Sequence, residues 1–148
     1  MSYSVGEALA LTRLQAVSGF SAVNTSRGKW DMLNTGKAAI YAVLYRPRPF
    51  QRAVGHTGLT KWTTLIQVWQ SFTKDGTSYI SLCDAVDAVI AAFDPYPHLG
   101  NPAVVEDSRI SAGSEVKEMW TKGGGGPAWL MVELTLEWTE RTTINMME

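Results

Sequence analysis

The 148-residue sequence has a single cysteine, Cys83, and only two histidines, His56 and His98. One cysteine excludes an intrachain disulfide, and it also excludes the paired cysteines of a zinc knuckle or a CxxC redox centre. A nucleophilic pair of Cys83 with His56 can be written down, because a thiolate needs a nearby base. Cys83 falls among the apolar positions of its expected helix, however, so we interpret it as a buried packing residue.

Long hydrophobic runs and a strong net charge are also lacking. No stretch approaches the roughly 18 uninterrupted apolar residues of a membrane helix, and the start, MSYSVGEALALTRLQ, does not have the pattern of a signal peptide. The formal net charge of -1 argues against binding by bulk attraction to nucleic acid or to an anionic membrane. We therefore expect a protein made in the cytoplasm, with no specific nucleic-acid recognition and no membrane association.

Two segments have the apolar spacing of amphipathic helices. The first runs from about Val5 to Val17, after a Ser4–Glu7 pair with the spacing of a capping box. The second follows the turn at residues 73–78 and runs to about Phe93, with apolar residues three and four positions apart. Between the first helix and residue 36 the text is rich in Ser, Asn, Thr and Gly, which predicts a long connection with at most one helical turn.

Five further segments have the pattern of strands: residues 38–45, 61–72, 103–110, 114–120 and 127–138. The last has the clearest alternation, because Leu130, Val132 and Leu134 alternate with Met131 and Glu133. The expected fold class is α+β: a mostly antiparallel sheet of four to five strands with an N-terminal helix and one central helix packed on it. The length fits a single domain over residues 1–148, with a loose C-terminal tail from about residue 140.

Four consecutive glycines, residues 123–126, stand between two strand patterns. A phosphate-binding loop needs Gly-x-x-x-x-Gly-Lys-Ser/Thr between a strand and a helix, whereas here Lys122 precedes the glycines and a strand pattern follows. A hinge between domains is also disfavoured, because one strand and a short tail cannot make a second core. We interpret the run as the tip of a hairpin and expect it to become ordered against a neighbouring subunit.

The remaining candidates for chemistry have structural explanations. Asp84, Asp87 and Asp94 could be drawn as a metal or acid cluster, but they are expected to be solvated charges on the second helix. The text RPRPFQR, residues 46–52, interleaves arginines with prolines and Phe50. It can be a solvated loop, a protein contact or a phosphate contact. The candidate subunit or partner contacts are Arg46, Arg48, Phe50, Arg52, His56, Lys122, Gly124 and Trp129.

Six tryptophans are many for a chain of this length, and tryptophan is favoured both in domain cores and in interface cores. Alternation predicts that Trp62 and Trp138 point into the core. Trp69 and Trp129 could be packed under helices or could lie at a subunit contact.

Three segments carry a characteristic order of elements: IYAVLYRPRPFQRAVGHTGLTKWTTLIQVW, DGTSYISLCDAVDAVIAAF and VVEDSRISAGSEVKEMW…WLMVELTLEW. This order resembles that of the tail terminator proteins of long-tailed (siphovirus-type) bacteriophages. The resemblance spans about Val5 to Trp138 and is one of pattern and element order.

The resemblance implies a structural virion protein and not an enzyme, without a cofactor or metal. Six copies would form a ring that caps the tail tube, ends its polymerisation and presents the surface for head-tail joining. Its partners would be copies of itself, the tail tube protein on one side and a head-completion or connector protein on the other. It would be assembled in the host cytoplasm and located in the tail or neck of the virion.

Three alternatives remain. Another neck or tail subunit of the same virus would form an open-ended polymer or a twelvefold ring. A small cytoplasmic enzyme using Cys83 would have a thiol that reacts rapidly in the native protein. A nucleic-acid-binding module would lose affinity steeply with added salt.

Overall fold

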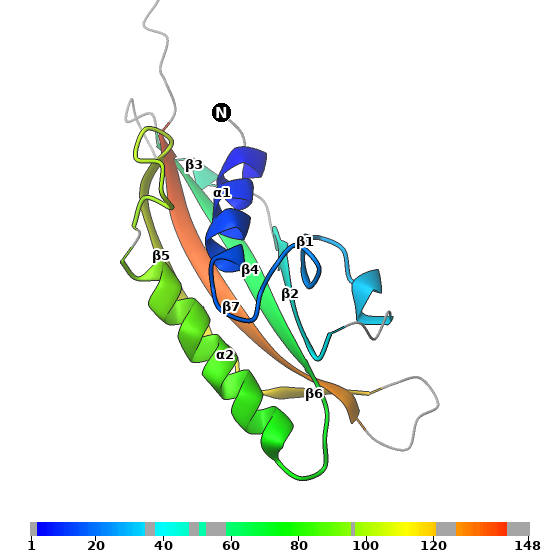
Figure 1. Ribbon diagram of the computed structural model, residues 1–148. Coiled ribbons are helices and arrows are strands. Elements are labelled where there is room, and N and C mark those ends of the chain that lie inside the picture. The colour runs from blue at the N-terminus through cyan, green and yellow to red at the C-terminus, as the bar shows by residue number, and fades with distance from the viewer. Residues whose placement is uncertain are drawn as a thin grey trace, which may run out of the picture.

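The computed structural model describes residues 3–34, 38–47, 51–52, 59–95, 97–120 and 127–141. These residues form an α+β fold of two α-helices and one mixed sheet (Figure 1). In chain order the elements are α1 (Tyr3–Gln15), β1 (Thr25–Arg27), the 3-10 turn η1 (Asp31–Asn34), β2 (Ile40–Tyr45), β3 (Gln51–Arg52), β4 (Leu59–Ser71), α2 (Thr77–Phe93), β5 (Val105–Gly113), β6 (Lys117–Trp120) and β7 (Pro127–Arg141).

The sheet is built around the long antiparallel pair of β4 and β7. These two strands pair over the whole of β4, from Leu59 opposite Arg141 to Ser71 opposite Trp129. The strand order is β1-β2-β4-β7-β5, with β3 added to β4 and β6 added to β7. All pairs are antiparallel except β1 with β2, which are parallel. In the described part of the chain, β1 and β5 are therefore the outer strands of the main path.

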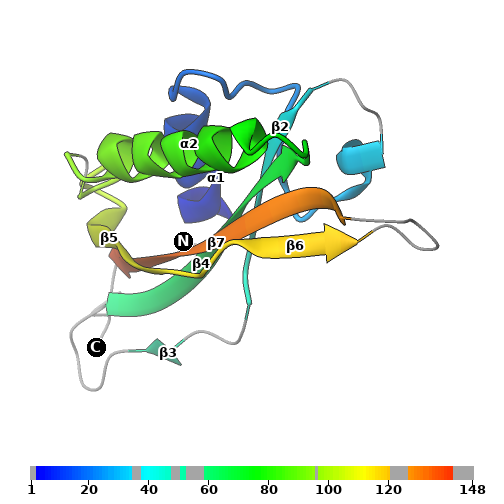
Figure 2. The same ribbon diagram turned by 90° about the horizontal axis from the view of Figure 1, so that it is seen from below.

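Both helices cover the same face of the sheet (Figure 2). Alternation along β4 and β7 places Trp62, Ile66, Leu134, Leu136 and Trp138 on this face, where all five are buried in the main core. Complete burial of one such aliphatic side chain contributes about 2 kcal/mol of transfer free energy. Trp62 and Trp138 thus point inward, as the alternation predicts.

The opposite face carries a smaller apolar cluster around Tyr41, Val43, Trp69 and Met131. Leu33 of η1 packs against this cluster, so the connection after β1 folds over part of the second face. Trp69 and Trp129 belong to this face, and neither is packed under a helix. We call this side of the sheet the open face.

The predicted α+β fold class is confirmed. The predicted number of strands is too low, and the segment predicted as a connection between the first helix and residue 36 contains a strand, β1. The sheet has seven strands instead of four or five, and it is mixed because β1 is parallel to β2. β1 lies in the polar connection, where no apolar alternation marks a strand. It is held by Asn24, whose amide nitrogen donates to the carbonyls of Gly19 (2.8 Å) and Ile40 (3.1 Å).

The predicted helices and the β6–β7 hairpin are present, with two local corrections. Ser4 and Glu7 do not form a capping box, because α1 already begins at Tyr3 and both side chains bond to Arg27. Cys83 is half-buried and not fully buried, since it lies one position beside Leu82 in the buried stripe of α2. The glycine tip at residues 123–126 and the tail after residue 141 lie outside the described residues.

Candidate functional site

The described residues hold no group of three or more His, Cys, Asp or Glu side chains that could bind a metal ion. Asp84, Asp87 and Asp94 are all exposed, as expected for solvated charges. Among the helices that the structure describes, none is both long enough and apolar enough to cross a membrane. The features that remain are surfaces and networks that join elements.

Three of the predicted contact residues fall in the described part of the chain. Arg46 is exposed, and its guanidinium lies 5.4 Å from the ring centroid of Tyr3 and 5.8 Å from that of Trp62. Trp129 is half-buried on the open face and meets Tyr41 edge to face at 5.7 Å. For Arg52 only the backbone is described, in β3. Outside the described residues lie Arg48, Phe50, His56, Lys122 and Gly124.

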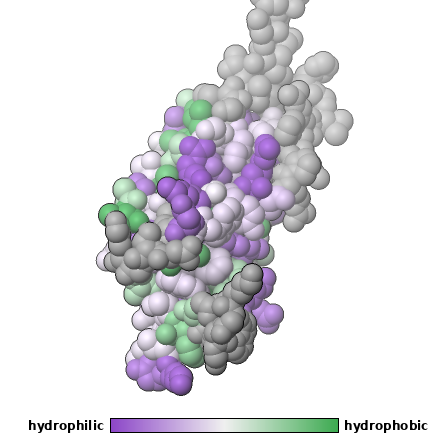
Figure 3. Space-filling model, turned by 90° about the vertical axis from the view of Figure 1, so that its right-hand side faces the viewer, coloured by the Kyte–Doolittle hydropathy of each residue, from purple (hydrophilic) through white to green (hydrophobic). Residues whose placement is uncertain are grey.

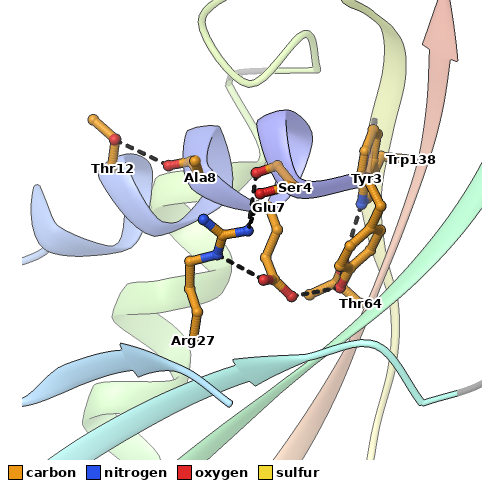
Figure 4. A network of polar contacts seen from close by, with 8 residues as sticks. All are labelled: Tyr3, Ser4, Glu7, Ala8, Thr12, Arg27, Thr64 and Trp138. Atoms are coloured by element: carbon orange, nitrogen blue, oxygen red, sulfur yellow. Dashed lines mark hydrogen bonds and ion pairs between the residues drawn. The ribbon is translucent and has the colours of Figure 1, made fainter. Parts of the chain in front are cut away.

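A directional chain of hydrogen bonds ties α1 to the sheet (Figure 4). The Tyr3 hydroxyl donates to Oε2 of Glu7 at 2.6 Å, and it also lies 2.8 Å from Oγ1 of Thr64. Trp138 Nε1 donates to the same Thr64 oxygen at 3.0 Å. Because the single Tyr3 proton goes to Glu7, the Thr64 hydroxyl must donate to Tyr3 while it accepts from Trp138.

The chain ends at a paired carboxylate. Glu7 is 6% exposed, and its Oε1 accepts from Arg27 Nε at 2.7 Å. Arg27 Nη2 donates in addition to the Ser4 hydroxyl at 2.8 Å and to the Ser4 carbonyl at 3.0 Å. Burial and the neighbouring Glu7 raise the pKa of Tyr3 above its ordinary range, so its phenol stays protonated at neutral pH. The network therefore ties α1 to β1 and to the sheet.

A second network crosses the open face from β2 to β7. Trp30 Nε1 donates to Oε1 of Gln67 at 2.7 Å, and Gln67 Nε2 donates to Oε2 of Glu133 at 2.9 Å. Tyr45 donates its hydroxyl proton to the same Glu133 oxygen at 2.9 Å. The Trp30 ring meets the Tyr45 ring edge to face at 5.3 Å, while 38% of Trp30 remains exposed. Trp30 thus lies on the open face, held by Gln67 and Tyr45, with part of its side chain exposed.

The Tyr45 phenol is expected to titrate at a higher pH than an ordinary tyrosine. Burial, followed by the hydrogen bond to Glu133, raises the pKa of Tyr45 to about 12. Since the pKa is raised in the folded state, the stabilising contribution is complete below about pH 10 and is lost as the pH rises through about 12. Residue-resolved NMR of the tyrosine ring carbons should give this midpoint.

A Glu133→Gln variant is the matched comparison, because it keeps an acceptor but removes the negative charge. Its Tyr45 pKa should move toward the ordinary value of about 10 without reaching it, because burial is the larger cause. An unchanged midpoint would show that Glu133 does not act on Tyr45.

An apolar groove of about 300 Å³ lies between α2 and the edge of the sheet. Its walls include Val86 and Ile90 of α2 and Ile110 of β5, and it is also lined by Val132 and Leu134 of β7. The pairing of β5 with β7 shifts between Ile110 and Ala112, and the edge then passes to Gly113. A β-carbon at Gly113 would lie 3.2 Å from Leu134 Cδ2, so the glycine leaves the floor of the groove uncovered.

The apolar lining of the groove on the α2 side comes from residues that lie beside the buried stripe of this helix. Leu82, Val89 and Phe93 are buried against the sheet, whereas Val86 and Ile90 are half-buried beside the stripe. β5 pairs only with β7 in the described part of the chain, so its outer backbone groups have no strand partner there. The groove and this open strand edge form one surface, which we call the α2–β5 surface.

Comparisons with known proteins identify the fold and no function. No known family model matches the sequence, and no curated protein matches it. The chain is similar to a solved protein chain known only by a sequence identifier, with a TM-score of 0.56 and 16% sequence identity. The match covers 98% of this chain and 99% of that chain. At this identity the likeness shows a shared fold over nearly the whole of both chains and nothing more.

Neither the α2–β5 surface nor the β1 edge is predicted from the sequence. Gly113 falls between two predicted strands, residues 103–110 and 114–120, whereas in the structure it is the last residue of β5. Glu7 was assigned to a helix cap, although Arg27 is available as a partner only because β1 brings it beside α1. No local pattern in the sequence could have placed these two residues together.

Proposed function

We propose that this protein is a tail terminator of a long-tailed bacteriophage. It is a structural virion subunit that assembles as a sixfold ring on the finished tail tube. The ring ends tube polymerisation and forms the surface for head-tail joining. Its neighbours are the tail tube protein on one side and a head-completion or connector protein on the other, and the subunit is a single domain that carries out no catalysis.

One observation carries this proposal: in the described residues, the sheet has an unpaired edge at each end, β1 and β5, and the two edges differ. A ring of identical subunits needs a heterologous contact, in which one patch of a subunit fits a different patch of the next. A twofold dimer would instead need a surface that fits itself. The element order gives further support, because the helices and long strands follow the order that the resemblance implies.

The test uses the tail tube protein from the same genome. Tube protein alone should polymerise to long tubes of variable length. Adding this protein in substoichiometric amounts should shorten the tubes, and negative-stain images should show a ring at one end only. Tubes isolated from cells infected with a phage that lacks the gene for this protein would serve as a second acceptor, in case the subunit forms rings only at a tube tip.

Two other outcomes would contradict the proposal. Incorporation along the whole tube would identify a tube subunit, the nearest alternative. Unchanged tube lengths, with no ring on isolated tails either, would exclude the terminator function.

A further inference from the structure

The charges of this chain are divided between its two halves. Residues 1–61 contain eight Lys and Arg but only two Asp and Glu, a net charge of +6. Residues 62–148 contain five Lys and Arg against twelve Asp and Glu, a net charge of -7. The two values sum to the overall charge of -1, so the near-neutral total conceals a strong asymmetry.

In the described part of the chain, the outer strands of the sheet come from different halves of the sequence. β1 and β2 come from the basic half and lie at one side, whereas α2 and β5 come from the acidic half and lie at the other (Figure 1). Lys29 and Arg46 are exposed on the first side together with one acid, Asp31, and Asp84, Asp87 and Asp107 are exposed on the second together with one base, Arg109. One subunit therefore presents a basic edge and an acidic edge of complementary charge.

The basic edge also carries an isolated apolar side chain. Val23, in the turn that leads into β1, is 65% exposed. The face of the molecule shown in Figure 3 is mixed, with hydrophilic and hydrophobic residues in small groups. Transfer of a projecting aliphatic side chain from water into a shallow apolar groove has a favourable free energy.

Strand register places the β1 edge and the α2–β5 surface at the same level. Thr25 pairs with Ala42, Ala42 with Val68, and Val68 with Val132, which lines the groove. Arg27 is related in the same way through Leu44 and Ile66 to Leu134, also in the groove. A heterologous contact between these two different surfaces gives a ring when the rotation between neighbouring subunits closes.

We propose that the β1 edge of one copy of this chain, with Val23 foremost, docks on the α2–β5 surface of the next copy. The basic edge then faces the acidic edge, and Val23 enters the groove beside Val86 and Ile90. This inference rests on the proposed function, because it names the contact from which the ring is built.

The test reverses the charge of each edge separately. The acidic-edge variant is Asp84→Lys with Asp87→Lys, and the basic-edge variant is Ala22→Glu with Lys29→Glu; all four positions are exposed. Self-association is measured by analytical ultracentrifugation over a concentration series at low salt. Each variant alone should associate at least about tenfold more weakly than the wild type, because like charges then face each other.

Mixing the two variants is the decisive step. In the mixture each reversed edge meets the other reversed edge, and each native edge meets the other native edge, so association should return as assemblies with an even number of subunits. Misfolded variants could not recover in this way. A Lys61→Glu variant is the matched control, because Lys61 is exposed in the central strand β4 and lies on neither edge, and it should associate like the wild type.

Three results would overturn the proposed contact: variants that associate like the wild type, no recovery on mixing, or no self-association of any of these proteins in solution or at tube tips. The tube assay separates this failure from failure of the proposed function. If each variant alone still caps tubes, the contact is wrong but the function stands. If association recovers on mixing while the wild type leaves tubes unchanged, the contact stands but the function is wrong.

Discussion

A Gly6→Ala variant is expected to lose about 3 kcal/mol of unfolding free energy, at the upper end of the usual cost of overpacking a core. A β-carbon at position 6 would overlap the six-membered ring of Trp138. That ring cannot move aside, because Trp138 is 2% exposed, donates to Thr64 and stacks against Tyr3 at 5.8 Å. The gain in helix propensity, about 1 kcal/mol for alanine over glycine, offsets only part of the cost.

Denaturant unfolding followed by far-UV circular dichroism measures this effect, with Gly19→Ala as the control. Gly19 has a φ of +95°, but a β-carbon there would meet no atom within 4 Å. Its cost should be about 1 kcal/mol, from backbone strain alone. Equal losses in the two variants would show that the approach of α1 to Trp138 is not tight.

A second comparison locates the clash on the Trp138 ring. Trp138→Leu creates a cavity and is destabilising by itself, but it also removes the atoms that a residue-6 side chain would meet. Gly6→Ala should therefore cost much less in the Trp138→Leu background than in the wild type. Additive effects in this double-mutant cycle would mean that the two positions do not interact.

The parts of the fold that were predictable from sequence are those in which one face of an element is buried. β7 alternates apolar and polar residues because one side of it packs under the helices, and α2 repeats its apolar residues every three to four positions for the same reason. β1 gives no such signal. It is three residues long, and its place in the sheet depends on the side chain of Asn24 and on pairing with a strand formed later in the chain.

The candidate surfaces were less predictable, because each combines residues that are distant in sequence. Within the segment 46–52, the guanidinium of Arg46 lies over the rings of Tyr3 and Trp62, contacts that require α1 and β4 together. The division of charge between the two halves is visible in the sequence alone. It acquires meaning only when the strand order places β1 and β2 at one side of the sheet and β5 at the other.

A Glu7→Leu variant is the second change with a large expected effect, a loss of about 2–3 kcal/mol. The substitution removes the acceptor of the Tyr3 proton and leaves Arg27 without its carboxylate. Loss of one partner of a fully buried ion pair costs about 3–5 kcal/mol. The side chain of Arg27 is 32% exposed, however, so its guanidinium can turn toward water and the cost is reduced.

Two comparisons separate the roles of the carboxylate, both measured as unfolding free energies. Glu7→Gln keeps an oxygen that can accept from Tyr3, so it should lose about 1 kcal/mol, the net value of an ordinary hydrogen bond. Arg27→Met should cost less in the Glu7→Leu background than in the wild type, because no carboxylate is then left unpaired. If Glu7→Leu proved as stable as the wild type, the hydrogen-bonded chain from Trp138 to Arg27 would not be what holds α1 against the sheet. In that case the packing of Ala10 and Leu14, both completely buried, would have to hold the helix alone.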